Sequence, residues 1–260
     1  MALNVHRFGP IDGPPLVALH GLTGHGGRWS ALAAEQLPNY CVFAPDLRGH
    51  GRSVGSPPWT LERHADDVAE TMQHLGLDHA PIMGHSLGAT VAVYLARCAP
   101  GRVARLILLD PGVGLRLEVA EQRARDALRA PEFDNPTQAA EERARFWPVE
   151  AHRLVDDEVR SHLAEGDDGR WRWRYSVPVA VATYSELARP FVVPPPDTPT
   201  LLVIAGRSRA VSPAFVEACQ SQLGASFSVA EIDCGHQVHL ERPAETGRLV
   251  REFLARPLPI

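Results

Sequence analysis

The sequence predicts an α/β protein with a mostly parallel central sheet and helices on both faces. Short, continuous apolar runs alternate along the chain with longer segments that have the 3.6-residue spacing of helices. The apolar runs lack the two-residue alternation of a half-solvated strand, which indicates that both faces of the sheet are covered. With 260 residues, 45% of them hydrophobic, the chain is long enough to bury one large core in a single globular unit.

The expected elements follow this rhythm from the N-terminus. An edge strand is expected at residues 3–8, before a turn rich in glycine and proline. Buried strands are expected at residues 16–19, 40–45, 80–84, 103–109, 200–205 and 227–232, and helices at 61–75, 87–98, 213–223 and 244–254. Alternation of this kind is typical of parallel strands joined by crossover helices.

One region interrupts the alternation. Residues 112–190 are rich in Arg, Glu and Ala and are expected to form a helical cap, inserted after the strand at residues 103–109. The predicted organisation is therefore a first part of the core at residues 1–111, the cap at 112–190 and a second part of the core at 191–260. Aromatic residues of the cap are expected either to line an apolar pocket or to pack the cap onto the core: Trp147, Trp171, Trp173 and Tyr175.

Composition narrows the classes of partner and compartment. The net charge of −5 and the pI near 6.2 provide no basic surface for phosphate, so nucleic acid is not expected as a partner. The first residues lack the pattern of a secretory signal and no run reaches membrane-spanning length, so we expect a soluble, cytoplasmic protein. Widely spaced cysteines without a CxxC pair are expected to be reduced: Cys41, Cys98, Cys219 and Cys234. The sequence leaves the oligomeric state open.

The strongest chemical signal is Gly84-His85-Ser86-Leu87-Gly88, a G-x-S-x-G pattern directly after an expected strand and before an expected helix. A sharp strand-to-helix turn leaves no space for a β-carbon two residues before or after the serine, so glycine is required there. The turn would expose the Ser86 hydroxyl at the carboxyl edge of the sheet, at a helix N-terminus that favours negative charge. Ser86 is therefore the candidate nucleophile, against the alternative that the pattern is an ordinary turn.

Two further groups are needed for catalysis by serine. Among 12 histidines, His236 follows the last expected strand on a loop at the carboxyl edge, and it is the candidate base. His239 is expected to pack nearby, while His20, His50 and His85 are expected to shape loops. The oxyanion of a tetrahedral intermediate requires backbone N–H donors, for which the candidates are the amides of Leu87 and of Leu22 in the His20 to Gly24 loop.

Together these residues resemble the α/β-hydrolase superfamily, in particular its single-cap serine esterase and lipase-like branch. The resemblance rests on the His20-Gly21 loop, Asp46 to Ser53, the Gly84 to Gly88 turn, Asp110-Pro111 and Gly235-His236. It implies a carboxylic ester hydrolase with a Ser-His-acid triad, acting on a small acyl ester without a metal or organic cofactor. Because dehalogenases and epoxide hydrolases of this fold use aspartate as nucleophile, Ser86 argues against both.

The sequence departs from the family at the acid. Most members carry it after the strand that corresponds to residues 200–205, but here Gly206-Arg207-Ser208-Arg209 follows, with Arg209 at the place of the acid. Some relatives carry the acid after the preceding strand, which makes Asp110 the candidate; the alternative is that Asp110 caps a turn before Pro111. Two other functions therefore stay open: hydrolysis of a carbon–carbon bond in a product of aromatic ring cleavage, and ligand binding with little turnover.

Overall fold

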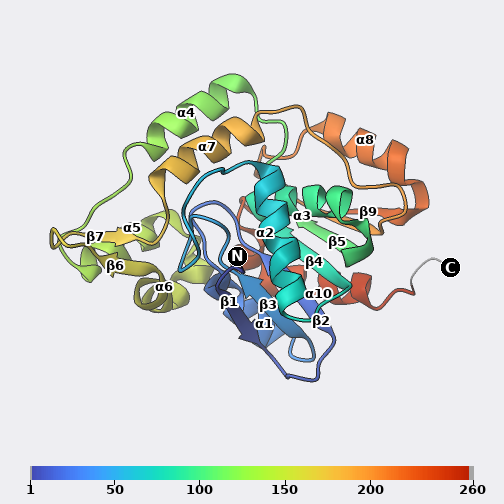
Figure 1. The fold of residues 1–260 in the computed structure, drawn as a ribbon, viewed down its shortest axis with the longest axis horizontal. Coiled ribbons are helices and arrows are strands. Elements are labelled where there is room, and N and C mark those ends of the chain that lie inside the picture. Colours follow the sequence, from blue (N-terminus) through green and yellow to red (C-terminus); the bar gives the residue numbers. More distant parts are fainter. Residues whose placement is uncertain (1, 258–260) are drawn as a thin grey trace.

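The computed structural model describes residues 2–257 and has the predicted α/β architecture (Figure 1). Its main sheet has the order β1-β3-β2-β4-β5-β8-β9, in which β1 is antiparallel to β3 and all other neighbours are parallel. The strands are β1 (Val5–Phe8), β2 (Pro15–Leu19), β3 (Cys41–Pro45), β4 (Ala80–His85), β5 (Val103–Leu109), β8 (Thr200–Ala205) and β9 (Phe227–Ile232). Each expected strand is present, within a residue or two of its predicted bounds.

Helices cover both faces of this sheet. They are α1 (Ser30–Gln36), α2 (Leu61–His74), α3 (Leu87–Cys98), α8 (Pro213–Leu223), α9 (Val238–Glu241) and α10 (Pro243–Leu254). Short 3₁₀ helices connect elements at η1 (Gly26–Trp29), η2 (Pro100–Arg102), η3 (Val149–Leu154) and η4 (Gly224–Ser226). The expected helices are confirmed, whereas α1 and α9 were not predicted because they have only seven and four residues.

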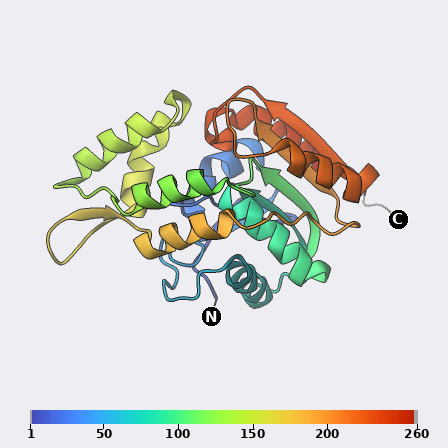
Figure 2. The ribbon, with the colours of Figure 1, turned by 90° about the horizontal axis from the view of Figure 1, so that it is seen from above.

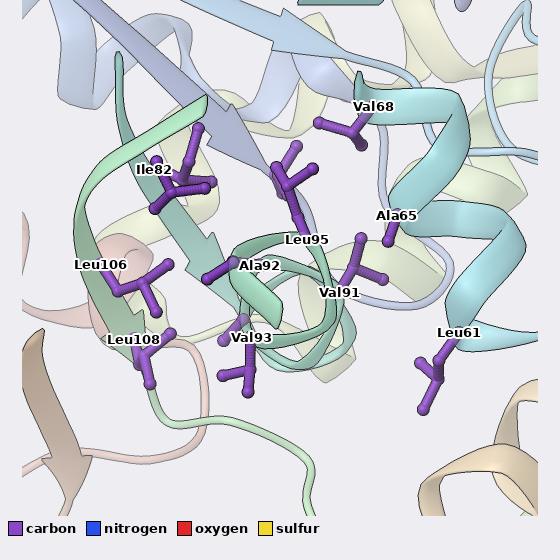
Figure 3. Close-up of a cluster of buried hydrophobic side chains, with 14 of the residues drawn as sticks. Leu61, Ala65, Val68, Ile82, Val91, Ala92, Val93, Leu95, Leu106 and Leu108 are labelled. Carbon is purple, nitrogen blue, oxygen red and sulfur yellow. The ribbon is translucent and has the colours of Figure 1, made fainter. Parts of the chain in front are cut away.

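Two hydrophobic clusters explain why the strand sequences are continuously apolar. Leu106 and Leu108 of β5 face the cluster formed with α2, α3 and α8 (Figure 3), and Ile107 and Leu109 face the cluster formed with α1 and α10. Successive residues of one strand thus bury against opposite helical layers. The expectation of full burial is wrong for β9, because it lies at the sheet edge and Val229 is 49% exposed.

The segment between β5 and β8 lies over one end of the sheet (Figures 1 and 2). It contains α4 (Leu117–Ala127), α5 (Pro136–Phe146), α6 (Val155–His162), β6 (Leu163–Glu165), β7 (Trp171–Trp173) and α7 (Val177–Leu187). Helices α4 and α7 pack side by side, and β6 pairs with β7 as a short antiparallel hairpin. The segment is therefore not purely helical as expected, because Gly166 to Gly169 closes a hairpin turn.

None of the helices within residues 2–257 has the length and apolar character needed to cross a membrane. Cytoplasmic location stays a prediction. The four cysteines are free, and three of them are buried: Cys41, Cys219 and Cys234. Burial raises the pKa of the Cys219 thiol to about 12 and that of Cys234 to about 11, so these thiols remain protonated and unreactive at neutral pH.

Candidate active site

Ser86 sits at the junction of β4 and α3 in a strained backbone conformation. Its φ is +52°, in the left-handed region that residues other than glycine rarely adopt. A β-carbon on Gly84 would lie 2.4 Å from the carbonyl carbon of Gly88, and one on Gly88 would lie 2.3 Å from the Leu19 carbonyl oxygen. The expected need for glycine at both positions is confirmed, since each permits a backbone contact that no side chain would allow.

The Ser86 hydroxyl is connected through His236 to a carboxylate. Ser86 Oγ donates a hydrogen bond to His236 Nε2 at 2.9 Å, and His236 Nδ1 donates to Asp110 Oδ2 at 2.6 Å. With the proton on Nδ1 held by the carboxylate, Nε2 carries the free lone pair that faces the hydroxyl. The residues come from the ends of β4 and β5 and from the loop after β9, which all reach the same edge of the sheet.

Asp110 is held rigidly at the end of β5. Its φ is +43°, its side chain is fully buried, and its amide donates to the Val203 carbonyl oxygen at 2.8 Å. The second carboxylate oxygen, Oδ1, accepts a hydrogen bond from the amide of Ala205 at 3.1 Å. Both oxygens of Asp110 are therefore engaged, one with β8 and one with the imidazole.

The loop after β8 contains arginines at the place of the usual acid. Arg207 forms an ion pair with Glu241, which also accepts a hydrogen bond from the amide of Gly235 at 2.8 Å. Arg209 is exposed and donates to no acceptor among residues 2–257. The only carboxylate that the described structure brings into contact with His236 is thus that of Asp110.

The two predicted oxyanion donors lie beside the Ser86 turn. A β-carbon on Gly21 would be 2.8 Å from His85 Nδ1 and 3.3 Å from Ser86 Cβ, so the loop after β2 is in direct contact with the turn. Thr23, with φ +62°, and the hydrogen bond from Gly24 N to Gly21 O at 3.0 Å fold this loop back on itself. The amides of Leu22 and Leu87 donate to no backbone carbonyl within residues 2–257, as is required of groups that are to meet a ligand oxygen.

Neighbouring histidines hold these loops in place. His20 donates from Nδ1 to Gly21 O at 2.8 Å and accepts from the amide of Leu47 at its Nε2, also at 2.8 Å. His85 donates from Nε2 to the carbonyl oxygen of His236 at 2.8 Å, which fixes the backbone of the candidate base. Burial lowers the pKa of His20 and of His85 well below the ordinary value, so both rings are neutral at physiological pH.

His239 and His50 pack as expected and do not reach the hydroxyl. The ring of His239 lies 4.6 Å from that of Trp29, and burial lowers its pKa to about 3. His50 donates from Nδ1 to the carbonyl oxygen of Arg48 at 3.0 Å, and burial lowers its pKa to about 4. Neither ring contacts Ser86 in the described structure.

The family follows from comparison with known proteins. The sequence profile described as "alpha/beta hydrolase fold" matches residues 14–243, most of the chain. The chain belongs to the α/β-hydrolase family.

Two curated relatives of this α/β hydrolase are named as ester hydrolases. It is 38% identical over 258 residues to lipase LipV of Mycobacterium tuberculosis, and the match covers 97% of each chain. It is 25% identical over 253 residues to esterase YbfF of Escherichia coli, and that match covers 97% of this chain and 96% of YbfF. Among solved structures it resembles E-2-(acetamidomethylene)succinate hydrolase, with a TM-score of 0.85, 24% identity and coverage of 98% and 95% of the two chains. Ester hydrolysis is therefore supported at the level of the family.

The α/β hydrolase has a cavity of about 550 Å³ that contains Ser86 and His236. Its walls come from the loop after β2, the segment between β5 and β8, and the loop after β8. The lining residues include Leu22, Gly112, Leu115, Val119, Tyr184 and Leu187, together with Arg28, Arg123, Arg143, Arg207 and Arg209. Of these arginines the sequence singles out only Arg209, because the others come together only through contacts between distant parts of the chain.

The expectation that the cap aromatics line this pocket is wrong. Trp147 and Trp173 are each 5% exposed. Trp147 belongs to a cluster that joins the inserted segment to Leu240 of α9, and Trp173 belongs to a cluster within the segment, against which Trp171 and Tyr175 pack. None of the four lines the cavity. The alternative, that these side chains pack the cap onto the core, describes Trp147, whereas the other three pack within the inserted segment.

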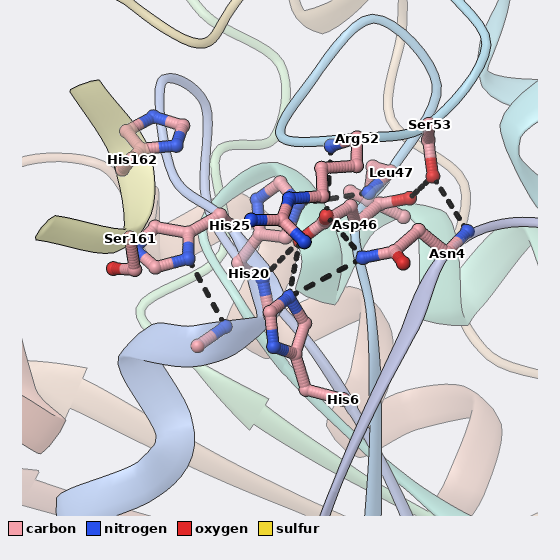
Figure 4. Close-up of polar contacts among 12 residues, drawn as sticks. Asn4, His6, His20, His25, Asp46, Leu47, Arg52, Ser53, Ser161 and His162 are labelled. Carbon is pink, nitrogen blue, oxygen red and sulfur yellow. Dashed lines mark hydrogen bonds and ion pairs between the residues drawn. The ribbon is translucent and has the colours of Figure 1, made fainter. Parts of the chain in front are cut away.

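One cluster outside the cavity has the residue types of a metal site. Ligand atoms of His6, His25 and Asp46 lie within 4.8 Å of one another (Figure 4). Both ring nitrogens of His25 are already engaged, since Nε2 donates to Glu158 at 2.9 Å and Nδ1 accepts from Gly27 N at 3.2 Å.

Asp46 already accepts hydrogen bonds at both of its carboxylate oxygens. It accepts from Asn4 Nδ2 at 2.7 Å, from His6 Nε2 at 3.1 Å, and from the amides of Gly26 at 2.8 Å and Arg52 at 2.9 Å. Burial raises the pKa of Asp46, but these hydrogen bonds outweigh burial and hold the pKa below its usual value. The described cluster has no free ligand set for a metal and instead anchors the loops around η1 and Arg52.

Proposed function

We propose that this α/β hydrolase is a serine hydrolase that cleaves carboxylic esters through an acyl-enzyme, with Ser86, His236 and Asp110 as its triad. The observation that carries the proposal is the hydrogen-bonded chain from Ser86 Oγ through His236 to Asp110, at 2.9 and 2.6 Å. The similarity to a lipase and an esterase supports ester cleavage over the carbon–carbon and ligand-binding alternatives.

In the acylation half-reaction, His236 Nε2 takes the hydroxyl proton as Ser86 Oγ attacks the ester carbonyl carbon. Asp110 stabilises the imidazolium that forms, because its carboxylate is buried and aligned with Nδ1. The amides of Leu22 and Leu87 stabilise the oxyanion, aided by the N-terminus of α3. Collapse of the intermediate breaks the ester C–O bond, and the alcohol leaves with the proton from His236.

Deacylation repeats the sequence with water. His236 takes a proton from a water molecule as the water oxygen attacks the carbonyl carbon of the acyl group on Ser86. The second tetrahedral intermediate then collapses: the bond from the acyl carbon to Ser86 Oγ breaks, His236 returns the proton to Oγ, and the carboxylic acid leaves. These steps use only groups of this chain, water and the ester. Residues 112–190 act as a cap in this proposal, since they provide one wall of the cavity above Ser86.

The proposal is tested with 4-nitrophenyl esters from acetate to decanoate. Wild type is expected to turn over part of this series, and Ser86→Ala and His236→Ala are expected to lose several orders of magnitude in kcat. Ser185→Ala, an exposed hydroxyl on α7, is the matched control and should retain wild-type rates. A fluorophosphonate probe should label Ser86 stoichiometrically; turnover that persists in Ser86→Ala, or labelling of another residue, would refute the assignment.

A further inference from the structure

The cavity is strongly cationic although the whole protein is anionic. Of its 21 lining residues, five are arginines and none is Asp or Glu, whereas the chain has a net charge of −5. The arginines are Arg28, Arg123, Arg143, Arg207 and Arg209. A low-dielectric cleft lined by one sign of charge concentrates ligands of the opposite sign.

Carboxylates behind the cavity wall neutralise only part of this charge. Glu158 binds Arg28 Nε at 3.1 Å and also lies 3.8 Å from Arg143. Arg207 is paired with Glu241 and, at 3.7 Å, with Asp233. Arg123 and Arg209 are exposed and form no ion pair with another residue in the range 2–257. The cavity therefore retains positive charge after the internal pairs are counted.

Arg143 is the most unusual of the five. It lies on α5, is only 9% exposed, and stacks over the Trp173 ring at 4.0 Å, with Trp147 at 5.6 Å. Its Nε is buried without a partner, and one terminal nitrogen forms a long ion pair with Glu158 at 3.8 Å rather than a hydrogen bond. The nearest carboxylate, Glu158, is 3.8 Å away and already bound by Arg28 and His25.

Because Arg143 lines the cavity, the guanidinium donors that no described residue accepts are available to a ligand there. An arginine has five N–H donors in a planar fork, and leaving buried donors unpaired destabilises a protein. Burial, followed by repulsion from Arg28, lowers the pKa of Arg143 to about 10, so the side chain is still cationic at neutral pH. Stacking on Trp173 fixes the plane of the fork, which is the preorganisation that recognition of carboxylate or phosphate requires.

We propose that the cavity binds an anionic group of the ester substrate, a carboxylate or phosphate, through Arg143, with Arg123 and Arg209 attracting it at the rim. The substrate class is thus an ester that carries a second, negatively charged group, such as a monoester of a dicarboxylic acid. The inference rests on the proposed function in that the ester bond is cleaved at Ser86. Binding of the anion itself does not depend on cleavage.

The kinetic test compares an anionic and a neutral ester of similar length, 4-nitrophenyl hemiglutarate and 4-nitrophenyl hexanoate. Wild type is expected to prefer the anionic ester in kcat/KM, mainly through KM, and Arg143→Met should lower that preference by about 10- to 100-fold. Arg143→Lys, which keeps the charge but loses the fork, should recover part of it. Arg145→Met, an exposed arginine two residues along the same helix and outside the cavity lining, should keep the wild-type preference.

Separate experiments test the contribution of Arg123 and Arg209 and decide whether the bound anion is a carboxylate or a phosphate. Arg123→Gln combined with Arg209→Gln changes two exposed side chains, so it should fold normally and lower the preference for the anionic ester even if Arg143→Met is unstable. Glutarate and inorganic phosphate are compared as competitive inhibitors; stronger inhibition by glutarate indicates a carboxylate, and stronger inhibition by phosphate indicates a phosphate. Inhibition by neither overturns the anion site.

Binding without turnover separates this inference from the proposed function. Ser86→Ala is expected to bind the stronger of the two inhibitors in calorimetry, and Ser86→Ala combined with Arg143→Met is expected to lose that binding. If wild type cleaves both esters with equal kcat/KM and neither anion binds Ser86→Ala, the anion site is wrong and the serine hydrolase stands. If the anion binds but wild type cleaves no ester, the hydrolase proposal is wrong instead.

Discussion

Replacing Asp110 by asparagine tests the triad more sharply than deletion of the carboxylate would. The amide of Ala205 is a fixed donor 3.1 Å from Oδ1, so the single oxygen of an asparagine would have to face β8. The NH₂ group would then face His236 Nδ1, now 2.6 Å from Oδ2. Because both groups cannot donate to each other, the imidazole would change tautomer and place its proton on Nε2, where it could no longer accept the proton of Ser86.

The expected loss is large because the wrong tautomer removes the base without moving it. A loss of about 10³- to 10⁴-fold in kcat corresponds to about 4–5.5 kcal/mol of transition-state stabilisation. The assay is hydrolysis of a good 4-nitrophenyl ester substrate, with thermal unfolding to verify that the variant is folded. KM should change much less than kcat, since Asp110 is fully buried behind His236 and does not line the cavity.

The matched control is Asp233→Asn, the same change at a side chain that is 87% exposed on the loop before His236. It should leave kcat within about threefold of wild type, as is usual for a surface substitution. A folded Asp110→Asn enzyme with kcat within tenfold of wild type would refute the argument and move the search for the acid elsewhere.

Three other predictions concern the groups that hold the site together. Glu158→Gln should destabilise the fold by about 3–5 kcal/mol in denaturant unfolding, because buried cations lose their carboxylate; an unchanged midpoint would contradict this. Gly88→Ala should cost about 2–3 kcal/mol and lower activity, since its β-carbon would lie 2.3 Å from the Leu19 carbonyl oxygen; a circular-dichroism melt identical to wild type would be evidence against the close contact. Stability should fall from pH 6.5 toward pH 3, because burial lowers the pKa of His64 and of His239 to about 3, so only the unfolded chain binds these protons across that range. Each histidine contributes up to about 1.4 kcal/mol per pH unit, and His64→Gln should reduce the slope measured by urea unfolding by one proton, whereas an unchanged slope would exclude His64 as a source.

The fold was predictable because its signals are local. Each strand of the sheet core is a short apolar run, and the two-layer burial of Leu106 to Leu109 makes that run continuous. The hairpin of β6 and β7 was missed because its strands have only three residues each, too few to show a two-residue alternation within a segment that is otherwise helical. The edge position of β9 was missed because strand order depends on pairing between distant segments, which periodicity does not encode.

The candidate nucleophile and base were predictable for a similar reason, whereas the lining of the cavity was not. Ser86 lies in a five-residue pattern flanked by a strand and a helix, and His236 directly follows the last strand. The role of Arg143 in the cavity depends on its distance from Glu158, on a different helix, and on contacts with Trp173, thirty residues further along. Arginine on a helix is ordinarily a solvated residue, so nothing in the local sequence distinguished Arg143 from Arg145.

The position of the acid and the charge of the cavity are physically connected. With the carboxylate of Asp110 supplied from β5, the loop after β8 is free of the constraint that it hold an acid against His236. Residues 207–210 of that loop line the cavity, and Arg209 occupies the place where an aspartate would add negative charge. Asp110 is fully buried behind His236 and does not line the cavity, so it adds no acidic group to the cavity wall. In the two proposals made above, an acid supplied from β5 leaves residues 207–210 free to carry the positive charge that attracts an anionic substrate.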